Sequence, residues 1–330
     1  MNTQTQTLDW NGAVSAIRLA KSVLLIAHVT PDADALGSAL ALGLACESLG
    51  KDVQVSVGEP GFTMPQSLVF LPRTDLVVAP ENLTATDLVI VCDTASVARL
   101  GVLADVVAQT QTSIVLDHHP SFNGFGTIHL VDPTAAATAA IAMELIERLG
   151  VDLTKDIASA LYSGLATDTG SFKFQATTSQ TLRIAAKLFD AGIDHASLAR
   201  QLFDDEPFEA LIMLGESLQR AELDKSAAKG LGLAYTSIAI NQRHGLTELA
   251  MERVIEAIRR ATEAEVAAVF KQADDKRWKV SLRSKTIVNV GELATKLGGG
   301  GHFFAAGYTS GTDLSESIAQ LKEQLNLLGD

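Results

Sequence analysis

The chain has 330 residues, of which 47% are hydrophobic, and a formal net charge of -13. This length suffices for two domains, and the hydrophobic content suffices for sizeable cores. The negative charge argues against a protein that binds long nucleic acid, duplex DNA included, because that binding needs many Lys and Arg contacts to phosphates. The apolar runs are too short to span a membrane, and the N-terminus has no basic and apolar leader, so we expect a cytoplasmic protein.

Apolar runs typical of buried strands alternate with helical stretches in the N-terminal half. The runs are VLLIA at 23–27, VQVSV at 53–57, LVIVC at 88–92 and SIVLD at 113–117. We expect helices at about 9–20, 35–49 and 96–108. This order predicts an α/β fold with a parallel sheet and helices on both of its faces. In such sheets, ligands bind beyond the carboxyl ends of the strands.

The second half of the chain is richer in helices and ends in a smaller α/β domain. Helices are expected between 132 and 167 and again from about 178 to 218. Beyond them, LGLAYTSIAI, EVAAVFKQAD and RWKVSLRSK resemble antiparallel strands, and helices are expected at 247–262, 289–297 and 314–328. We therefore predict an N-terminal domain at 1–186, a helical connector at 187–225 and a C-terminal domain at 226–330.

Acidic and imidazole side chains follow three of the predicted strands at the point where each strand ends. They are His28, Asp32 and Asp34 after the first run, Asp93 after the third, and Asp117, His118 and His119 at the end of the fourth. A further aspartate, Asp168, follows a helix in the segment TDTGSF, before an expected short strand SFKF at 171–174. Taken alone, each aspartate is more typical of a helix cap or a turn than of a functional site. As a set, they predict a shared site at one edge of the sheet.

Four converging aspartates would repel one another unless cations lay between them. Two divalent ions carry the charge that balances Asp32, Asp34, Asp93 and Asp168, and His28 with His118 or His119 would complete a shell of nitrogen and oxygen ligands. Because the set has no thiolate, Mn²⁺ is favoured over structural zinc, with Mg²⁺ or Co²⁺ as substitutes. Two ions about 3.5–4 Å apart are typical of phosphoester hydrolysis. The pattern therefore predicts a two-metal phosphoesterase.

Two smaller features complete the composition. Cys46 and Cys92 fall in an expected helix and an expected buried strand, which favours reduced core residues. From Lys271 to Lys296 there are seven Lys or Arg against three Asp or Glu. One small basic region on an acidic body suits a short anionic ligand, although a solvated pair of strands with lysine-rich edges would give the same count.

The segments HVTPDADALGS, VCDTA, LDHHP and TDTGSF, in that order, resemble the motifs of the DHH phosphoesterase superfamily. Far downstream, GGGGH at 298–302 resembles the glycine-rich motif of the DHH-associated C-terminal domain. Within the superfamily, the chain is similar to the oligoribonucleases (nanoRNases) that are also pAp phosphatases. The resemblance implies a manganese-dependent enzyme with its active site between the domains, and a homodimer.

The resemblance also implies the substrates. These are RNA of about two to five nucleotides, cleaved to mononucleotides, and 3′-phosphoadenosine 5′-phosphate (pAp), dephosphorylated to AMP; the net negative charge agrees, because it repels long polyanions more than short ones. The N-terminal domain would be the catalytic, metal-binding domain and the C-terminal domain would bind substrate.

The family's motifs imply a role for each matching residue. His28, Asp32 and Asp93 would bind one ion, and Asp34, Asp93, His118 and Asp168 the other, with Asp93 shared. His119 would contact the scissile phosphate and assist proton transfer, and Asp117 would orient a histidine. Gly299, Gly300 and Gly301 would admit a phosphate to backbone N–H groups, while Arg283 and His302 would hold the substrate. Thr138 is the hydroxyl in TAAATAA that would support the metal ligands.

Other functions share much of this pattern. A phosphodiesterase for cyclic or linear dinucleotides (c-di-AMP, pApA) would need no change in the motifs. A RecJ-like exonuclease usually carries an extra binding domain, and a soluble pyrophosphatase would have a different C-terminal signature without GGGGH. A non-catalytic nucleotide-binding module would hold nucleotide without turnover at any Mn²⁺ level.

Overall fold

The computed structural model describes residues 8–243, 245–246, 248–273 and 275–327. The chain divides into two units, Met1–Asp205 and Glu206–Asp330, each with its own hydrophobic clusters. The range predicted as a connector, 187–225, is divided between the units: the end of α6 (Ser179–Asp190) and α7 (His195–Phe203) belong to the first unit, and α8 (Phe208–Gln219) belongs to the second. No helix of the described part of the chain is long and apolar enough to cross a membrane.

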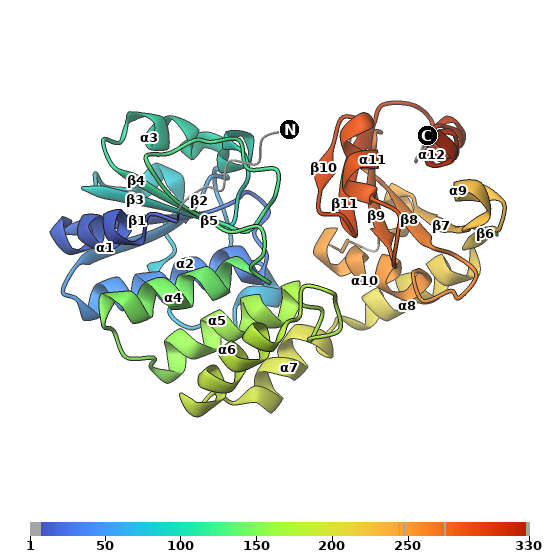
Figure 1. Ribbon diagram of the computed structural model, residues 1–330. Helices are drawn as coiled ribbons and strands as arrows, with labels where there is room; N and C mark the ends of the chain where they lie inside the picture. Colours follow the sequence, from blue (N-terminus) through green and yellow to red (C-terminus); the bar gives the residue numbers. More distant parts are fainter. Residues whose placement is uncertain (1–7, 244, 247, 274, 328–330) are drawn as a thin grey trace. The chain divides into compact units, whose positions relative to one another are not determined.

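A five-stranded parallel sheet forms the centre of the first unit (Figure 1). Its strands are β1 (Ser22–Ala27), β2 (Asp52–Val57), β3 (Leu88–Cys92), β4 (Ser113–Asp117) and β5 (Ile128–Val131). They lie in the order β2-β1-β3-β4-β5, so the direction of strand addition reverses at β1. Such a reversal leaves a crevice at the carboxyl ends of the two strands between which it occurs, here β1 and β3. The predicted α/β fold is confirmed, with β5 added.

Helices cover both faces of this sheet, as predicted. One large core unites the sheet with α1 (Trp10–Leu19), α2 (Ala33–Ser48), α4 (Thr138–Leu149) and α5 (Lys155–Asp168). On the other face, where Figure 1 shows α3 (Ala104–Gln109), a second core contains residues such as Leu24, Val89 and Leu103. The helix expected at 96–108 is instead a 3-10 segment, η4 (Val97–Leu103), broken at Gly101 and followed by α3.

Short 3-10 turns link the second and third strands of the sheet. They are η1 (Gln66–Leu68), η2 (Thr74–Leu76) and η3 (Pro80–Asn82). Cys46 and Cys92 are both buried and free, as the sequence predicted. Burial raises the pKa of the Cys46 thiol to about 12, so this thiol stays protonated and unreactive.

The strand expected at 171–174 is not formed. After α5 ends, Ser171 and Phe172 have left-handed backbone conformations, which a strand cannot contain. The amides of Lys173 and Phe174 donate to the carbonyl oxygen of Thr169, which curls the chain into tight turns. The Thr169 hydroxyl accepts the Phe172 amide and so satisfies the polar backbone within the turn.

The second unit has a six-stranded mixed sheet in the order β10-β11-β9-β8-β7-β6. Its strands are β6 (Glu222–Asp224), β7 (Leu233–Ile238), β8 (Val266–Gln272), β9 (Trp278–Ser284), β10 (Gly300–Gly301) and β11 (Ala305–Ser310). One face packs against α9 (Ala227–Gly230), α11 (Val290–Lys296) and α12 (Leu314–Leu327), and the other against α8 and α10 (Glu248–Ile258). A short 3-10 turn, η5 (Ile240–Gln242), follows β7.

One strand pairing in this unit corrects the prediction. β7 and β8 are parallel, not antiparallel, and only β8 with β9 forms the expected antiparallel pair. The reason is α10, which lies between β7 and β8 in the chain and crosses over the sheet. After this crossover the chain enters β8 at the same end of the sheet at which it entered β7, so the two strands run in the same direction. Residues 247 and 328, the expected first and last residues of two helices, lie outside the described residues.

Candidate metal centre and active site

The carboxyl ends of β1 and β3 bring His28 and Asp93 together. Ala27 is the register partner of Cys92, so the residues that follow each strand are neighbours at the edge of the sheet. His28 is buried, and its Nε2 lies 3.6 Å from Asp93 Oδ2 and 3.7 Å from Asp32 Oδ2. His28 Nδ1 lies 2.9 Å from the Val29 carbonyl oxygen. A proton on Nδ1 would be donated there, which leaves the Nε2 lone pair facing the two carboxylates.

Asp32, which faces His28, is also the N-cap of α2. Its Oδ1 accepts the amides of Asp34 and Ala35, each at 3.0 Å. The sequence left the cap of this helix to Asp34 or Ser38, but the cap is Asp32: one of its oxygens caps the helix and the other faces His28.

Asp93 lies at the centre of the cluster. Its backbone is left-handed, with φ 60°, and its amide donates to the Leu116 carbonyl oxygen of β4. Its Oδ1 lies 3.5 Å from His118 Nε2 and accepts the Thr138 hydroxyl at 2.8 Å. Burial raises the pKa of Asp93, but His28, His118 and His119 lower it more strongly, so the carboxylate is charged.

The N-terminus of α4 holds Asp34, which is fully buried. The backbone amides of Thr138 and Ala139 donate to its two oxygens at 2.7 and 2.9 Å. These are unpaired donors of the first helical turn, and the helix dipole favours a negative charge there. Burial nevertheless raises the pKa of Asp34, and the charges of Asp168 and Asp93 raise it further.

The end of β4 and the end of α5 supply the remaining members. His118 Nε2 lies 3.1 Å from Asp168 Oδ2, and Asp168 is the last residue of α5. His119 Nδ1 lies 2.7 Å from Asp117 Oδ1, and Asp117 is fully buried at the end of its strand. All the predicted site residues of the first unit therefore gather at this one edge of the sheet.

The electrostatics of the cluster fit bound cations. Burial lowers the pKa of His28, but the neighbouring Asp32 and Asp93 raise it to about 10. Burial and the carboxylates around Asp168 raise the pKa of that residue, although His118 lowers it. Without a cation, the cluster must take up protons to limit repulsion between carboxylates. A divalent cation would replace those protons.

Three groups within the first unit each offer ligand atoms that lie within 4.8 Å of one another. The groups are His28, Asp32 and Asp93; Asp34, Asp93 and His118; and Asp93, Asp117 and His119. Asp93 belongs to all three. Imidazole nitrogen with carboxylate oxygen, and no sulfur, is a donor set that suits divalent metal ions. The residues therefore fit a divalent cation, and Asp93 is common to the groups that could hold one.

The predicted substrate residues lie in the second unit. Gly298–His302 is a tight reversal in which Gly300 and Gly301 pair with β11. A Cβ at Gly299 would lie 2.1 Å from the Gly307 carbonyl oxygen, so packing alone already demands glycine at this position. Arg283 lies 3.1 Å from Glu252 and 3.4 Å from Glu256 on α10. Both features have structural partners within the unit.

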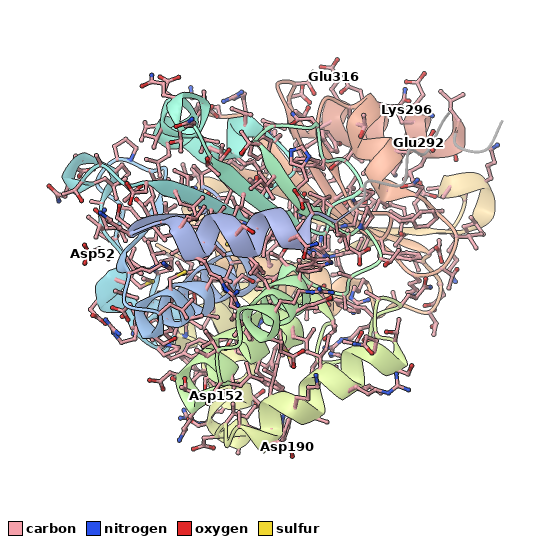
Figure 2. All side chains as sticks on the ribbon, turned by 60° about the vertical axis from the view of Figure 1, so that its left-hand side comes forward. Asp52, Asp152, Asp190, Glu292, Lys296 and Glu316 are labelled. Carbon is pink, nitrogen blue, oxygen red and sulfur yellow. The ribbon has the colours of Figure 1, made fainter. Side chains whose placement is uncertain are left out.

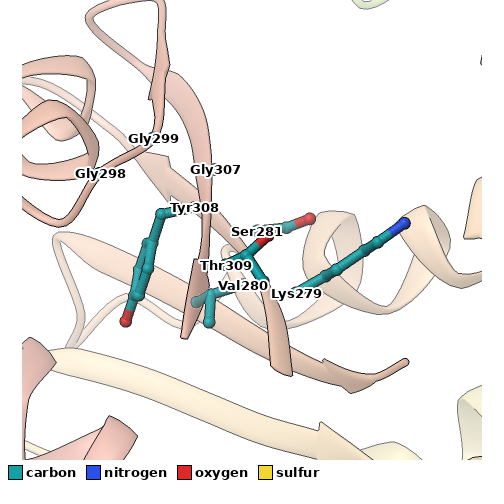
Figure 3. A pocket seen from close by; sticks show the side chains of 8 residues that line it. All are labelled: Lys279, Val280, Ser281, Gly298, Gly299, Gly307, Tyr308 and Thr309. Atoms are coloured by element: carbon teal, nitrogen blue, oxygen red, sulfur yellow. The ribbon is translucent and has the colours of Figure 1, made fainter. Parts of the chain in front are cut away.

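A shallow pocket of about 320 Å³ opens beside this glycine run (Figure 3). It is lined by Lys279, Val280, Ser281, Gly298, Gly299, Gly307, Tyr308 and Thr309. Figure 3 shows the Tyr308 ring on one side of β11 and the side chains of Lys279 and Ser281 on the other. The Tyr308 side belongs to the core, whereas the Lys279 side is polar.

Most of the basic region at 271–296 is engaged in local ion pairs. Lys271 pairs with Glu252, Arg277 with Asp275, and Lys296 with Glu292 on the outer surface of α11 (Figure 2). The local excess of basic residues in the sequence is therefore largely neutralised by carboxylates from α10 and from the region itself. The count of Lys and Arg against Asp and Glu in this region therefore overstated the positive charge available to bind a ligand.

Sequence reasoning missed two contributors to the cluster. Arg99 reaches the His28 ring from η4, in a stretch that was expected to be a plain helix. Gly164 of α5 packs so closely on α2 that a Cβ there would lie 2.5 Å from Asp34 Oδ1. Neither has a local sequence signal, because both depend on contacts between distant segments.

Buried carboxylates and imidazoles at the edge of a parallel sheet are typical of metal-dependent hydrolases. The model of the DHH family, N-terminal domain, matches residues 22–165, and that of the DHHA1 domain matches residues 232–328. A protein of Thermus thermophilus named bifunctional oligoribonuclease and PAP phosphatase NrnA is 34% identical over 304 residues, 91% of this chain and 88% of that protein. The chain therefore belongs to the DHH family.

Two other relatives extend the comparison. A probable bifunctional oligoribonuclease and PAP phosphatase NrnA of Streptococcus mutans is 31% identical over 96% of this chain and 97% of its own length. A cyclic-di-AMP phosphodiesterase, GdpP of Bacillus subtilis, is 24% identical over 93% of this chain but only 48% of its own length.

Solved structures share the fold. An exopolyphosphatase-related protein from Bacteroides fragilis has a TM-score of 0.87 at 22% identity, covering 98% of both chains. An exonuclease RecJ, bound to manganese, has a TM-score of 0.53 at 18% identity, covering 98% of this chain and 96% of the other.

Proposed function

We propose that the chain hydrolyses short oligoribonucleotides to mononucleotides and dephosphorylates pAp to AMP, with two Mn²⁺ ions as cofactor. The observation that carries this proposal is Asp93, whose carboxylate belongs to both a His28–Asp32 group and an Asp34–His118 group. One carboxylate common to two ligand groups suits a pair of ions. Two relatives above 30% identity are named for these two activities.

The residues of the cluster take separate roles in this proposal. His28, Asp32 and Asp93 hold one ion, and Asp34, Asp93, His118 and Asp168 hold the other. When bound, the ions neutralise charge on the phosphate and activate water. His119 contacts the scissile phosphate and moves a proton toward the leaving oxygen, and Asp117, 2.7 Å from its Nδ1, fixes the orientation of its ring.

The second unit provides substrate recognition in the same proposal. Gly299, Gly300 and Gly301 bring backbone N–H groups to the substrate, and His302 and Arg283 contact its far end. For Arg283 this requires an exchange of partners, because the guanidinium is paired with Glu252 and Glu256. We further propose a homodimer that acts in the cytoplasm; light scattering tests the oligomeric state.

A second candidate function is hydrolysis of cyclic or linear dinucleotides such as c-di-AMP. The similarity to GdpP, which spans 93% of this chain, favours it. The chemistry at phosphorus would be unchanged, and only the groups that bind the rest of the substrate would differ. The two candidates are therefore separated by substrate and not by metal dependence.

One assay panel tests both candidates. Initial rates are measured with Mn²⁺ on RNA of two, three, five and twenty-four nucleotides, on pAp and on c-di-AMP, each with wild type and His302→Ala. We expect the fastest cleavage with the shortest RNAs, and a selective loss on them in His302→Ala. EDTA should abolish every activity.

Three results would redirect the proposal. Faster turnover of c-di-AMP than of short RNA would favour the second candidate. A rate that increases with RNA length at fixed salt would contradict the preference for short substrates. Nucleotide binding without turnover at any Mn²⁺ level would mean a non-catalytic module.

A further inference from the structure

One arginine of the first unit lies at the edge of the metal-ligand cluster. Arg99 Nη2 lies 2.7 Å from His28 Nδ1, 3.3 Å from His28 Nε2 and 3.4 Å from the Val29 carbonyl oxygen. Among the described residues, no carboxylate forms an ion pair with this guanidinium, although Asp32 and Asp93 lie close to the same imidazole. Arg99 is thus a cation beside a group of carboxylates and remains largely exposed.

The fold fixes the position of Arg99 through the backbone. The Val29 amide donates to the Arg99 carbonyl oxygen at 2.8 Å, and the Val102 amide donates to that of Gly58 at 3.0 Å. Gly101 has φ +54°, and a Cβ there would lie 2.1 Å from the Gly58 carbonyl oxygen. Leu100 is fully buried between these contacts. Segment η4 is therefore held against the ends of β1 and β2, and this places the Arg99 side chain beside the His28 ring.

The partner that Arg99 has here is not compatible with a metal-binding His28. His28 Nε2 faces Asp32 and Asp93, so it is the nitrogen that would bind an ion. Nδ1 then carries the proton and donates to the Val29 carbonyl oxygen. A protonated Nδ1 cannot accept a hydrogen bond from Arg99, and an Nε2 whose lone pair binds an ion cannot accept one either, although it lies 3.3 Å from Arg99 Nη2 here. The guanidinium would keep one long contact, to Val29, and would have N–H groups available for another acceptor.

We propose that Arg99 binds a phosphate oxygen of the substrate from the first unit. The planar guanidinium matches phosphate geometry and stays charged. An anionic phosphate approaching Asp32 and Asp93 gains from a neighbouring cation that forms no ion pair with a carboxylate of the described residues. This contact rests on the proposed function only in taking a phosphate ester as the ligand, and it is separate from those assigned to the glycine run and His302.

Binding experiments without turnover test the proposal. Wild type, Arg99→Gln, Arg99→Lys and Arg183→Gln are each loaded with Mn²⁺ and titrated by calorimetry with AMP and with inorganic phosphate. Arg183 is the matched control, because it is an exposed arginine on α6 whose contact is the Ser179 hydroxyl at 3.3 Å. We expect Arg99→Gln to weaken the binding of both ligands by about 10- to 100-fold, with Arg99→Lys intermediate and Arg183→Gln unchanged.

A second titration, with Mn²⁺ alone, separates phosphate binding from a role in positioning His28. We expect Arg99→Gln to bind Mn²⁺ as wild type does. If it loses Mn²⁺ affinity, and AMP binding recovers at saturating Mn²⁺, Arg99 only positions the imidazole and the proposal is wrong. It is also wrong if Arg99→Gln binds AMP as tightly as Arg183→Gln, or if wild type binds neither ligand. A wild type that binds AMP through Arg99 but cleaves no RNA and no pAp overturns the proposed function alone.

Discussion

At the scale of single residues, Asp93 is the most important member of the metal-ligand cluster, because it belongs to each of the three ligand groups of the first unit. Its left-handed backbone directs the carboxylate toward three histidines, and strain of this kind is commonly found at functional sites. Asparagine tolerates the same backbone, so Asp93→Asn changes charge and ligand chemistry with little change in shape.

We predict that Asp93→Asn lowers the rate of pAp hydrolysis by about 100-fold or more, since one substitution removes a ligand common to both groups. Circular dichroism should show an unchanged fold. Asp152→Asn, a change of the same kind at an exposed position of the first unit, is the control. An Asp93→Asn enzyme with the activity of Asp152→Asn would exclude Asp93 as a shared ligand.

Thr138 shows how one residue supports two carboxylates. Its hydroxyl donates to Asp93 and its backbone amide to Asp34, so only the first bond depends on the side chain. We predict that Thr138→Val, which keeps the branched shape, weakens Mn²⁺ affinity by about 10- to 100-fold. Thr138→Ser retains the hydroxyl and should bind Mn²⁺ nearly as wild type does; equal losses in both variants would assign the effect to packing.

At the scale of elements, the close packing of α2 on α5 buries the Asp34 side chain between the two helices. A Cβ at Gly37 would lie 2.5 Å from the Ala160 carbonyl oxygen, and one at Gly164 would lie 2.8 Å from Asp34 Cα. Alanine is the better helix former by about 1 kcal/mol, but forcing apart a packed interface costs about 1–3 kcal/mol. Packing therefore outweighs helix propensity at these positions.

Two glycine substitutions test this balance. We predict that Gly164→Ala destabilises the protein by about 1–2 kcal/mol and lowers its activity. Gly215→Ala in α8, where a Cβ would meet nothing within 4 Å, should instead stabilise it by about 0.5–1 kcal/mol. Urea unfolding measures both free energies, and opposite signs are expected. A stabilising Gly164→Ala with full activity would contradict the packing account.

Some of these elements could be predicted from the sequence and others could not. Runs such as VLLIA and LVIVC are continuous because both faces of a parallel sheet are buried, so the strands and the His28–Asp93 edge were predictable. The short β5, with His129 inside it, lacked that signal. The pairing of β7 with β8 depended on whether the intervening helix crosses the sheet. The position of Arg99 depended on Gly58 and Gly101, which are distant in sequence and meet only in the fold.

At the scale of the whole molecule, the cluster couples stability to pH. In the metal-free protein, burial lowers the pKa of His28, but Asp32 and Asp93 raise it to about 10. An unfolded histidine titrates near pH 6.5. The folded state thus holds the proton more tightly, and this stabilisation is complete below about pH 6.5 and lost as the pH rises toward 10. The raised pKa of Asp34 acts in the same direction.

We predict that, in EDTA, the Tm of the first unit falls between pH 6.5 and pH 10. Mn²⁺ affinity should increase over the same range, because the ions displace protons from His28 and His118. Scanning calorimetry measures the Tm, and titrations in two buffers of different ionisation enthalpy measure proton release. The transition of the second unit, which lacks these residues, is the internal control. A metal-free Tm that rises with pH would refute this coupling.

We propose that one shared carboxylate, that of Asp93, joins two ion sites in the first unit. The number of Mn²⁺ ions bound per chain at saturation, measured by equilibrium dialysis with elemental analysis for wild type and Asp93→Asn, tests this most directly. We predict two ions per wild-type chain and a clear loss of both from Asp93→Asn. A single ion in wild type, or two ions retained by Asp93→Asn, would contradict a shared carboxylate.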